Sequence, residues 1–196
     1  MEQMKLPERI TGTTDIAHAF AGAYLLPGET AVDCTAGNGY DTLFLLERNG
    51  PNGFVYAFDI QQSAVDNTRK RLCEAGISPD RFLLINDSHS RLSQYVKGPV
   101  AVFMFNLGYL PGGDRTITTD APTVIHALSS SITLLKCLGV ITVVMYPGHG
   151  PGRVEQEAVM KYVTGLDQHL CRVLHIQSVN TEKPSPSVLV IQKLYP

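Results

Sequence analysis

The sequence predicts an α/β fold in which a mostly parallel sheet carries helices on both faces. Short apolar runs alternate with longer amphipathic segments along most of the chain, and such alternation is typical of βαβ units. Phe54–Phe58, Val100–Phe105 and Val140–Tyr146 are almost wholly apolar, as expected of strands that are covered on both faces. The 196 residues suffice for one domain with a core and are too few for two ordinary ones, so we expect a single domain over 1–196.

The individual elements follow from the pattern of apolar residues. Buried strands appear as short, continuous apolar runs, and amphipathic helices have apolar residues that recur with the helical period. In chain order, strands are expected at Ala31–Thr35, Phe54–Phe58, Phe82–Ile85, Val100–Phe105, Val140–Tyr146, Arg172–Ser178 and Ser187–Gln192. Helices are expected at Thr14–Leu25, Tyr40–Asn49, Ser63–Ala75, Ala121–Leu135 and Arg153–Leu166, with a short turn near Arg91–Val96.

The last two expected strands follow each other without an intervening helix. They are separated by Asn180–Pro186, which contains two prolines and is typical of a turn or hairpin loop. An antiparallel strand at the end of an otherwise parallel sheet is the natural result. We therefore expect a Rossmann-like sheet that is mostly parallel and has an antiparallel C-terminal strand.

The composition argues against several classes of protein. The net charge of −2 provides no overall basic field for nucleic acid, so any site for a polyanion has to be a local patch. The four cysteines form no C-x-x-C pair, which argues against zinc or a redox dithiol and fits a reducing compartment. The N-terminus lacks the apolar core of a signal peptide, and no apolar run reaches the roughly 20 residues that cross a bilayer. We expect a cytoplasmic protein with no metal and no membrane partner.

The first expected strand ends in a glycine-containing turn that suits a nucleotide. Asp33 precedes the turn Ala36-Gly37-Asn38-Gly39, and Asp41 and Thr42 fall in the first turn of the next helix. A dinucleotide fingerprint would have a third glycine in place of Thr42 and would hold a pyrophosphate. The carboxylates of Asp33 and Asp41 would repel a pyrophosphate, but they would attract the ammonium and sulfonium groups of S-adenosylmethionine. We therefore predict an S-adenosylmethionine site here, although a simple tight turn would show the same glycines.

Polar residues at the ends of the second and third strands suit the adenosine part of this cofactor. Asp59 can accept both ribose hydroxyls, or it can cap the helix that begins near Ser63. Ile60 and Gln61 come next and are expected to contact the adenosine. Asp87-Ser88-His89 can contact the adenine edge or, equally, cap the next short helix, and His89 can also face the substrate.

The end of the fourth strand is the predicted site of methyl transfer. Asn106 leaves an apolar strand, where its amide would be costly to bury without partners. Its side-chain oxygen and the backbone carbonyls of Leu107 and Gly108 can accept hydrogens from an amine and point its lone pair at the methyl group. Tyr109 can stack on a planar base. The loop contains no cysteine for an adduct at a pyrimidine carbon, so N- or O-methylation is favoured. The alternative is a glycine-rich turn capped by the asparagine.

Positively charged and imidazole side chains follow the fifth strand. His149 and Arg153 can reach over the same rim as Arg115 of the preceding loop, where they would contact a phosphate or a base. They can equally be exposed loop residues. His18 and His126 lie in helical patterns and are expected to be packing or surface residues.

Three segments together resemble a known family. Val32–Thr42, Phe58–Gln61 and Phe105–Asp114 are similar to the corresponding segments of a small bacterial family labelled putative rRNA methylases, which includes tRNA 5-(aminomethyl)uridine methyltransferases. The resemblance covers nearly the whole chain. Many other methyltransferases have Asn-Pro-Pro-Tyr where this chain has Asn106-Leu107-Gly108-Tyr109. That departure argues against planar base amines as the target.

The resemblance implies a class I methyltransferase fold with seven strands, S-adenosylmethionine as cofactor and a tRNA anticodon stem-loop as partner. The implied reaction converts 5-aminomethyl-2-thiouridine at the wobble position into 5-methylaminomethyl-2-thiouridine. An aliphatic amine needs only to lose a proton and be aligned, and Tyr146 and His149 are the candidates for amine contact or proton loss. The base would be splayed out and stacked on an aromatic residue. The resemblance also suggests a homodimer.

Two other hypotheses remain open at this point. The first is a methyltransferase for rRNA or for a small-molecule amine or hydroxyl, which the near-neutral charge favours mildly. The second is a non-catalytic nucleotide-binding module. Tight binding of NAD without binding of S-adenosylmethionine would support the second.

Overall fold

Seven strands form one sheet in the order β3-β2-β1-β4-β5-β7-β6. The structure is a computed structural model, and it describes residues 12–108, 110, 112, 118–148, 150–182 and 184–195. The strands are β1 (Thr30–Asp33), β2 (Phe54–Phe58), β3 (Phe82–Ile85), β4 (Val100–Asn106), β5 (Leu135–Met145), β6 (Cys171–Gln177) and β7 (Ser187–Lys193). The helices are α1 (Thr13–Tyr24), α2 (Tyr40–Arg48), α3 (Gln62–Glu74), α4 (Ala121–Leu134) and α5 (Gly150–Thr164), with 3₁₀ helices η1 (Pro79–Arg81) and η2 (His89–Gln94).

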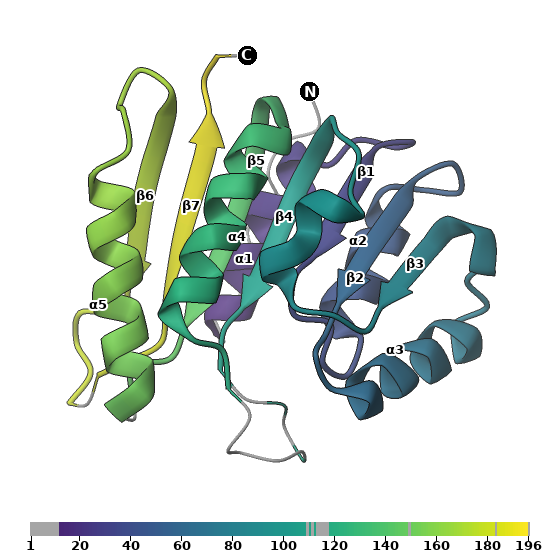
Figure 1. Cartoon of the computed structure of the whole chain (residues 1–196), viewed down its shortest axis with the longest axis horizontal. Coiled ribbons are helices and arrows are strands. Elements are labelled where there is room, and N and C mark those ends of the chain that lie inside the picture. Colours follow the sequence, from purple (N-terminus) through teal and green to yellow (C-terminus); the bar gives the residue numbers. More distant parts are fainter. Residues whose placement is uncertain are drawn as a thin grey trace.

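The predicted fold class is confirmed. β1 to β5 run parallel, whereas β7 pairs antiparallel with both β5 and β6. Figure 1 shows β7 pointing opposite to β4 and β2, and the hairpin of the two last strands forms one end of the sheet. No described helix is long and apolar enough to cross a membrane.

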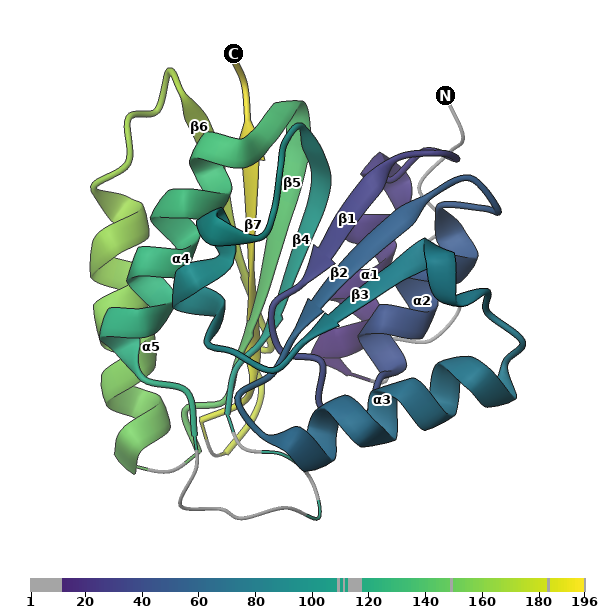
Figure 2. The same ribbon diagram turned by 45° about the vertical axis from the view of Figure 1, so that its right-hand side comes forward.

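Apolar side chains on both faces of the sheet explain the unbroken apolar strands. In β4, Phe103 and Phe105 join the core beneath η2, α4 and α5. Val102 and Met104 point the other way, into the core that α1, α2 and α3 cover. Figures 1 and 2 show the two layers of helices on opposite sides of the sheet. Each fully buried side chain of this size stabilises the fold by about 1.5–3 kcal/mol.

The beginning of β5 differs from the prediction. We expected a helix to Leu135 and a strand from Val140, but the strand begins at Leu135, directly after α4. Leu135 pairs with Val100, and a shift in register follows before Val140 pairs with Val102. Leu138 adopts a φ of 63° within this irregular stretch, and a Cβ at Gly139 would lie 2.8 Å from the Ala101 carbonyl oxygen. Pairing with β4 therefore determines the conformation from Leu135 onward, although the local sequence pattern predicts that the helix includes Leu135.

The order of the strands places a ligand site between β1 and β4. The chain moves from β1 outward to β2 and β3 on one side and returns to β4 on the other. Asp33 pairs with Ala57 of β2 and with Met104 of β4, so the carboxyl ends of these strands lie at one edge. In open α/β sheets, ligands bind at such a switch point, outside the carboxyl ends of the strands.

Candidate active site

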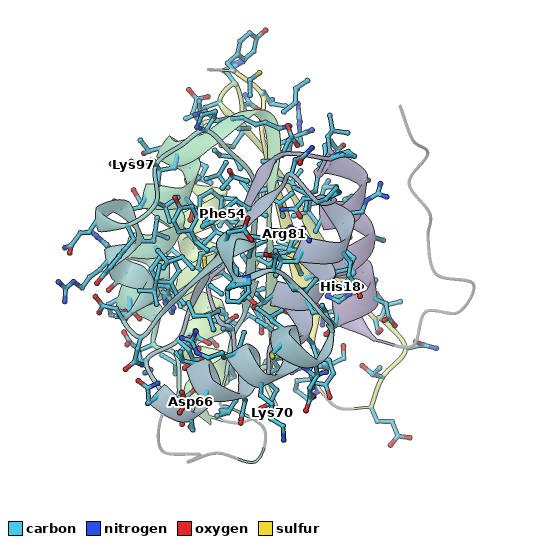
Figure 3. All side chains as sticks on the ribbon, turned by 90° about the vertical axis from the view of Figure 1, so that its right-hand side faces the viewer. His18, Phe54, Asp66, Lys70, Arg81 and Lys97 are labelled. Atoms are coloured by element: carbon cyan, nitrogen blue, oxygen red, sulfur yellow. The ribbon has the colours of Figure 1, made fainter. Side chains whose placement is uncertain are left out.

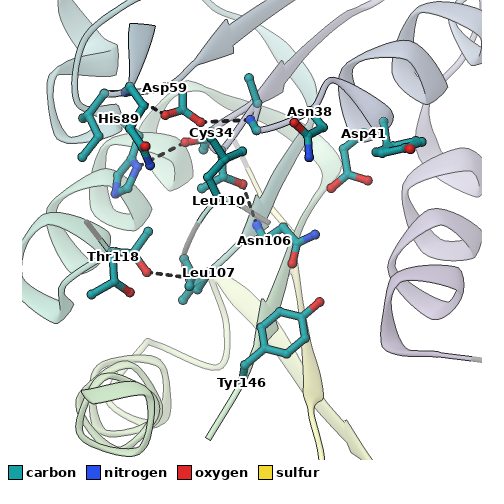
Figure 4. A pocket seen from close by; sticks show the side chains of 18 of the residues that line it. Cys34, Asn38, Asp41, Asp59, His89, Asn106, Leu107, Leu110, Thr118 and Tyr146 are labelled. Atoms are coloured by element: carbon teal, nitrogen blue, oxygen red, sulfur yellow. Dashed lines mark hydrogen bonds between the residues drawn. The ribbon is translucent and has the colours of Figure 1, made fainter. Parts of the chain in front are cut away.

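A pocket of about 1010 Å³ opens at this edge of the sheet. That volume is at the upper end of the roughly 300–1,000 Å³ common for small-molecule sites. Its walls come from both sides of the switch point (Figure 4). Thirteen residues predicted for the site line it: Ala36, Gly37, Asn38, Asp41, Asp59, Ile60, Gln61, Ser88, His89, Asn106, Leu107, Gly108 and Tyr146.

The loop after β1 is held tightly against its neighbours. Gly37 and Gly39 have φ angles of 54° and 79°, which favour glycine. A Cβ at Gly39 would lie 2.9 Å from the Cα of Thr68, so only glycine lets the loop approach α3 this closely. The Gly37 amide donates to Asp59 Oδ2 at 2.9 Å, and its carbonyl accepts from the Thr68 hydroxyl at 3.2 Å. The loop is therefore preorganised.

Of the two carboxylates predicted to face a cationic ligand, Asp41 lines the pocket and Asp33 does not. Asp33 is fully buried beneath the loop. Its Oδ2 accepts from the Thr42 hydroxyl at 2.6 Å, and its Oδ1 accepts from the Thr35 amide at 3.0 Å. Thr42 and Gly39 likewise lie outside the pocket wall. This corrects the sequence-based expectation, because these three residues shape the loop from behind.

Asp33 should make folding stability depend on pH. Burial, and secondly the charge of Asp41, raises its pKa from 3.8 to about 7. Folding thus favours the protonated carboxyl, so its stabilising contribution is full below pH 3.8 and is lost as the pH rises through about 7. The contribution of Asp33 to the free energy of unfolding changes by at most about 4 kcal/mol over this pH range. In urea unfolding from pH 4 to pH 8, Asp33→Asn should show a smaller loss of stability than the unaltered protein. If the free energy of unfolding changed with pH equally in both proteins, this prediction would be wrong.

The carboxyl end of β2 carries the carboxylate of Asp59, which accepts two hydrogen bonds from the protein and has lone pairs left over. Asp59 Oδ1 accepts from the Gln61 amide at 2.9 Å, and Oδ2 accepts from Gly37. Burial raises the pKa of Asp59, while these backbone hydrogen bonds oppose the rise. A carboxylate has about four lone-pair sites, so Asp59 can bind further hydroxyl donors inside the pocket.

The residues after β3 divide between capping and the pocket. Ser88 is the N-cap of η2 and also lines the pocket. Asp87 does not line it: its carboxylate accepts from the Tyr95 hydroxyl at 2.7 Å, which lowers its pKa, and from the Ser88 amide at 2.8 Å. The Asp87 carboxylate therefore makes structural contacts outside the pocket wall, whereas Ser88 both caps η2 and lines the pocket.

His89 forms part of the pocket wall, and its surroundings favour the neutral imidazole. Burial lowers its pKa. Its Nδ1 lies 3.2 Å from the Cys34 carbonyl oxygen, and its ring meets Phe105 edge-on. Its buried Nε2 has no hydrogen-bond partner among the described residues. With Nδ1 donating to the carbonyl, Nε2 carries a lone pair that can accept a hydrogen from a ligand.

The β4 end positions Asn106 by its backbone. The Asn106 amide donates to the Thr35 hydroxyl at 2.7 Å, and the Leu107 amide donates to the Val144 carbonyl at 2.9 Å. Gly108 exchanges hydrogen bonds with Thr119, donating to its hydroxyl at 2.9 Å and accepting from its amide at 3.1 Å. Within the described part of the chain, no hydrogen bond joins the Asn106 side-chain amide to another residue. This amide lines the pocket and is available to a ligand.

The sequence did not point to His18, which α1 brings into the pocket. Its Nε2 lies 2.7 Å from Asp41 Oδ1, and its ring stacks on Phe44 with centroids 4.0 Å apart and planes 2° from parallel. The helical pattern around His18 predicts a packing or surface residue. The partners are 23 residues apart, so no local pattern links them.

Several predicted residues lie elsewhere. Arg153 is exposed on α5, 3.9 Å from Glu157, and does not line the pocket. Tyr109, Arg115 and His149 lie outside the described residues. No described group of histidine, cysteine, aspartate and glutamate side chains could hold a metal ion.

The charges of the pocket favour a cationic ligand. The described lining residues include three carboxylates, Asp41, Asp59 and Asp120, and no lysine or arginine. A pyrophosphate would meet repulsion here, whereas a sulfonium or ammonium group would be attracted.

Comparisons with known proteins identify the family. The model of the family described as "Putative rRNA methylase" matches residues 55–192. A chloroplastic tRNA (mnm⁵s²U34)-methyltransferase of Arabidopsis thaliana is 39% identical over 162 residues, 78% of this chain and 59% of that protein. This chain thus spans about three fifths of the length of that relative.

Two solved structures extend the likeness over the fold. One, titled a putative rRNA methylase from Clostridium thermocellum, is 40% identical with a TM-score of 0.92, covering 95% of this chain and 100% of that one. Another, titled a putative methyltransferase from Streptococcus mutans in complex with SAH, is 32% identical with a TM-score of 0.85 at the same coverage. The chain therefore belongs to the Putative rRNA methylase family and has its class I methyltransferase fold.

Proposed function

We propose that this protein is an S-adenosylmethionine-dependent N-methyltransferase. Its proposed substrate is the aminomethyl group of the wobble uridine in the tRNA anticodon stem-loop. The main supporting observation is one acidic pocket that joins the glycine loop and Asp59 to the Asn106 side-chain amide, which has no hydrogen-bond partner among the described residues. The name of the Arabidopsis relative, a tRNA (mnm⁵s²U34)-methyltransferase, supports the choice of acceptor.

The half of the pocket near β2 and β3 suits the cofactor's adenosine. Asp59 is proposed to accept the ribose hydroxyls with the lone pairs that Gly37 and Gln61 leave free. Ile60, Gln61 and Ser88 line the space where the adenine would lie, and His89 Nε2 can accept a hydrogen there. S-adenosylmethionine, when bound, supplies an electrophilic methyl group on a sulfonium, whose charge the pocket's carboxylates favour.

The half near α1, β4 and β5 suits the acceptor. Asn106 is proposed to accept a hydrogen from the substrate amine and so direct its lone pair. Tyr146 lines the same region, and Figure 4 shows its hydroxyl directed toward Asn106. A Cβ at Gly108 would lie 3.9 Å from the Tyr146 ring, and its φ of 128° disfavours any side chain there. The space beside Tyr146 thus stays open for a base.

An aliphatic amine is mainly protonated near neutral pH, so it must lose a proton before it can attack. His18 and Asp41 are the ionisable pair at this end of the pocket, and their 2.7 Å contact orients the imidazole. The stack on Phe44 fixes the ring further. We assign His18 as the proton acceptor and Asp41 as the group that holds it.

Replacing His18 by glutamine should lower kcat about 10- to 100-fold because the proton acceptor is lost. Glutamine can still donate to Asp41, so the pocket should persist. The deficit should shrink as the pH rises, since more of the amine is then already deprotonated. Methylation rates of both proteins between pH 6.5 and 9.5 would check this. A constant ratio across that range would mean that His18 takes no proton.

The direct test of the function uses purified protein, S-adenosylmethionine and anticodon stem-loops that carry 5-aminomethyl-2-thiouridine or unmodified uridine. We expect mass spectrometry to show one added methyl only on the aminomethylated stem-loop. A fragment of rRNA and free small amines serve as competing acceptors. Transfer to one of these, with none to the stem-loop, would refute the proposed substrate. Binding of NAD instead of S-adenosylmethionine in calorimetry would refute the reaction class.

A further inference from the structure

An exposed aromatic ring with one covered face lies at the rim of the pocket. Tyr40, the first residue of α2, lines the pocket and is 64% exposed. The guanidinium carbon of Arg71 in α3 lies 3.6 Å from the centroid of its ring. We propose that the open face of Tyr40 is a stacking site for an unpaired nucleobase of the RNA, next to the nucleotide that enters the pocket. This inference rests on the proposed function.

The ring is held in place before any ligand arrives. Arg71 Nε donates to the Asn38 carbonyl at 2.6 Å, which ties the guanidinium to the glycine loop. Asn67 Nδ2 donates to Asn38 Oδ1 at 3.0 Å, so α3 and the loop are joined a second time. The close approach of Gly39 to Thr68 adds a third connection. A preorganised surface loses little entropy when it binds.

The chemistry of this surface fits a base better than a phosphate. Every nucleobase has a π face that can stack on an aromatic ring regardless of sequence, and proteins that bind single-stranded RNA use such rings. Figure 3 shows Asp66 and Lys70 both projecting from α3, so the neighbouring charges are mixed. The guanidinium of Arg71 already contacts the Tyr40 ring and the Asn38 carbonyl. The flat ring is therefore the distinctive feature for recognition.

The position of Tyr40 also fits a base outside the reaction centre. It directly precedes Asp41, which holds His18 in the half of the pocket assigned to the acceptor. The cofactor's adenine is assigned to Ile60, Gln61 and Ser88 in the other half. A base on Tyr40 would thus help to place the splayed target nucleotide without touching the cofactor.

The test compares Tyr40→Ala and Tyr40→Phe with the unaltered protein. A matched control is Tyr195→Ala, since Tyr195 is 67% exposed and does not line the pocket. Each protein is assayed for KM with the aminomethylated stem-loop and with the free aminomethylated nucleoside. Affinity for the stem-loop is also measured by fluorescence anisotropy, and affinity for S-adenosylmethionine by calorimetry.

We expect Tyr40→Ala to raise the KM and Kd for the stem-loop roughly 10-fold. Its KM for the nucleoside and its Kd for S-adenosylmethionine should not change. Tyr40→Phe and Tyr195→Ala should behave like the unaltered protein. Unchanged stem-loop affinity in Tyr40→Ala, or an equal loss of cofactor affinity, overturns the inference. Failure of the unaltered protein to methylate the stem-loop overturns the proposed function instead, and the anisotropy comparison still decides whether Tyr40 binds RNA.

Discussion

Replacing Asp59 by alanine is expected to raise the Kd for S-adenosylmethionine at least about 100-fold. The substitution removes the proposed ribose contact, and it also leaves the amides of Gly37 and Gln61 without their acceptor. Hydrogen bonds to a charged group contribute about 1.5–3 kcal/mol each, so losing two or more of them accounts for this factor. Isothermal titration calorimetry with the cofactor measures the change directly.

Asp66→Ala is the matched control for this experiment. Asp66 is an exposed carboxylate on α3 that accepts a hydrogen bond from Gln62 and does not line the pocket. Its removal should leave the Kd unchanged. Asp59→Asn, which keeps one acceptor oxygen, should lie between the unaltered protein and Asp59→Ala. If Asp59→Ala folds normally by circular dichroism and binds the cofactor as tightly as before, Asp59 is not the ribose ligand.

The second large effect is expected at Asn106, where alanine should lower kcat about 10²–10³-fold. The backbone position of Asn106 is set by Thr35, and Leu107 beside it is bound to Val144. These bonds do not involve the side chain, so alanine should preserve the loop. The substitution removes the side-chain oxygen that is proposed to align the amine. Single-turnover methylation of the aminomethylated stem-loop, together with cofactor titration, separates chemistry from binding.

The contrast between the two variants tests the division of the pocket. Asn106→Ala should bind S-adenosylmethionine normally while it transfers the methyl group slowly. Asn106→Asp, which retains an acceptor oxygen of the same reach, should keep more of the rate than alanine. Equal turnover of Asn106→Ala and the unaltered protein would remove Asn106 from the reaction centre.

Much of the fold was predictable because its signals are local. Strands that are buried on both faces are apolar, as β2, β4 up to Phe105 and most of β5 are. The two prolines before β7 marked the turn that reverses the last strand. The start of β5 was predicted wrongly because Leu135 is apolar in either setting. Its pairing with Val100 is what places Leu135 in the strand and not in the helix.

Site residues that directly follow a strand could be predicted from the sequence. Contacts between side chains that are far apart in the sequence could not. Sequence placed Asp59 and Asn106 at strand ends, and a parallel sheet brings such ends to one edge. It could not tell that Asp33 faces inward while Asp41 faces the pocket, because both flank the same turn. The turn of the backbone between them, with Thr42 and Thr35 as partners for Asp33, makes that difference.

The sequence by itself determined the class of fold, the edge of the sheet that carries the site and the acidic character of that edge. These depend on patterns within a few residues, namely apolar runs, glycines and the polar residues that follow each strand. Only the tertiary structure decided that His18 meets Asp41 and that Arg71 covers Tyr40. Those contacts join residues 23 and 31 positions apart on different helices, and packing against a common sheet is what brings them together.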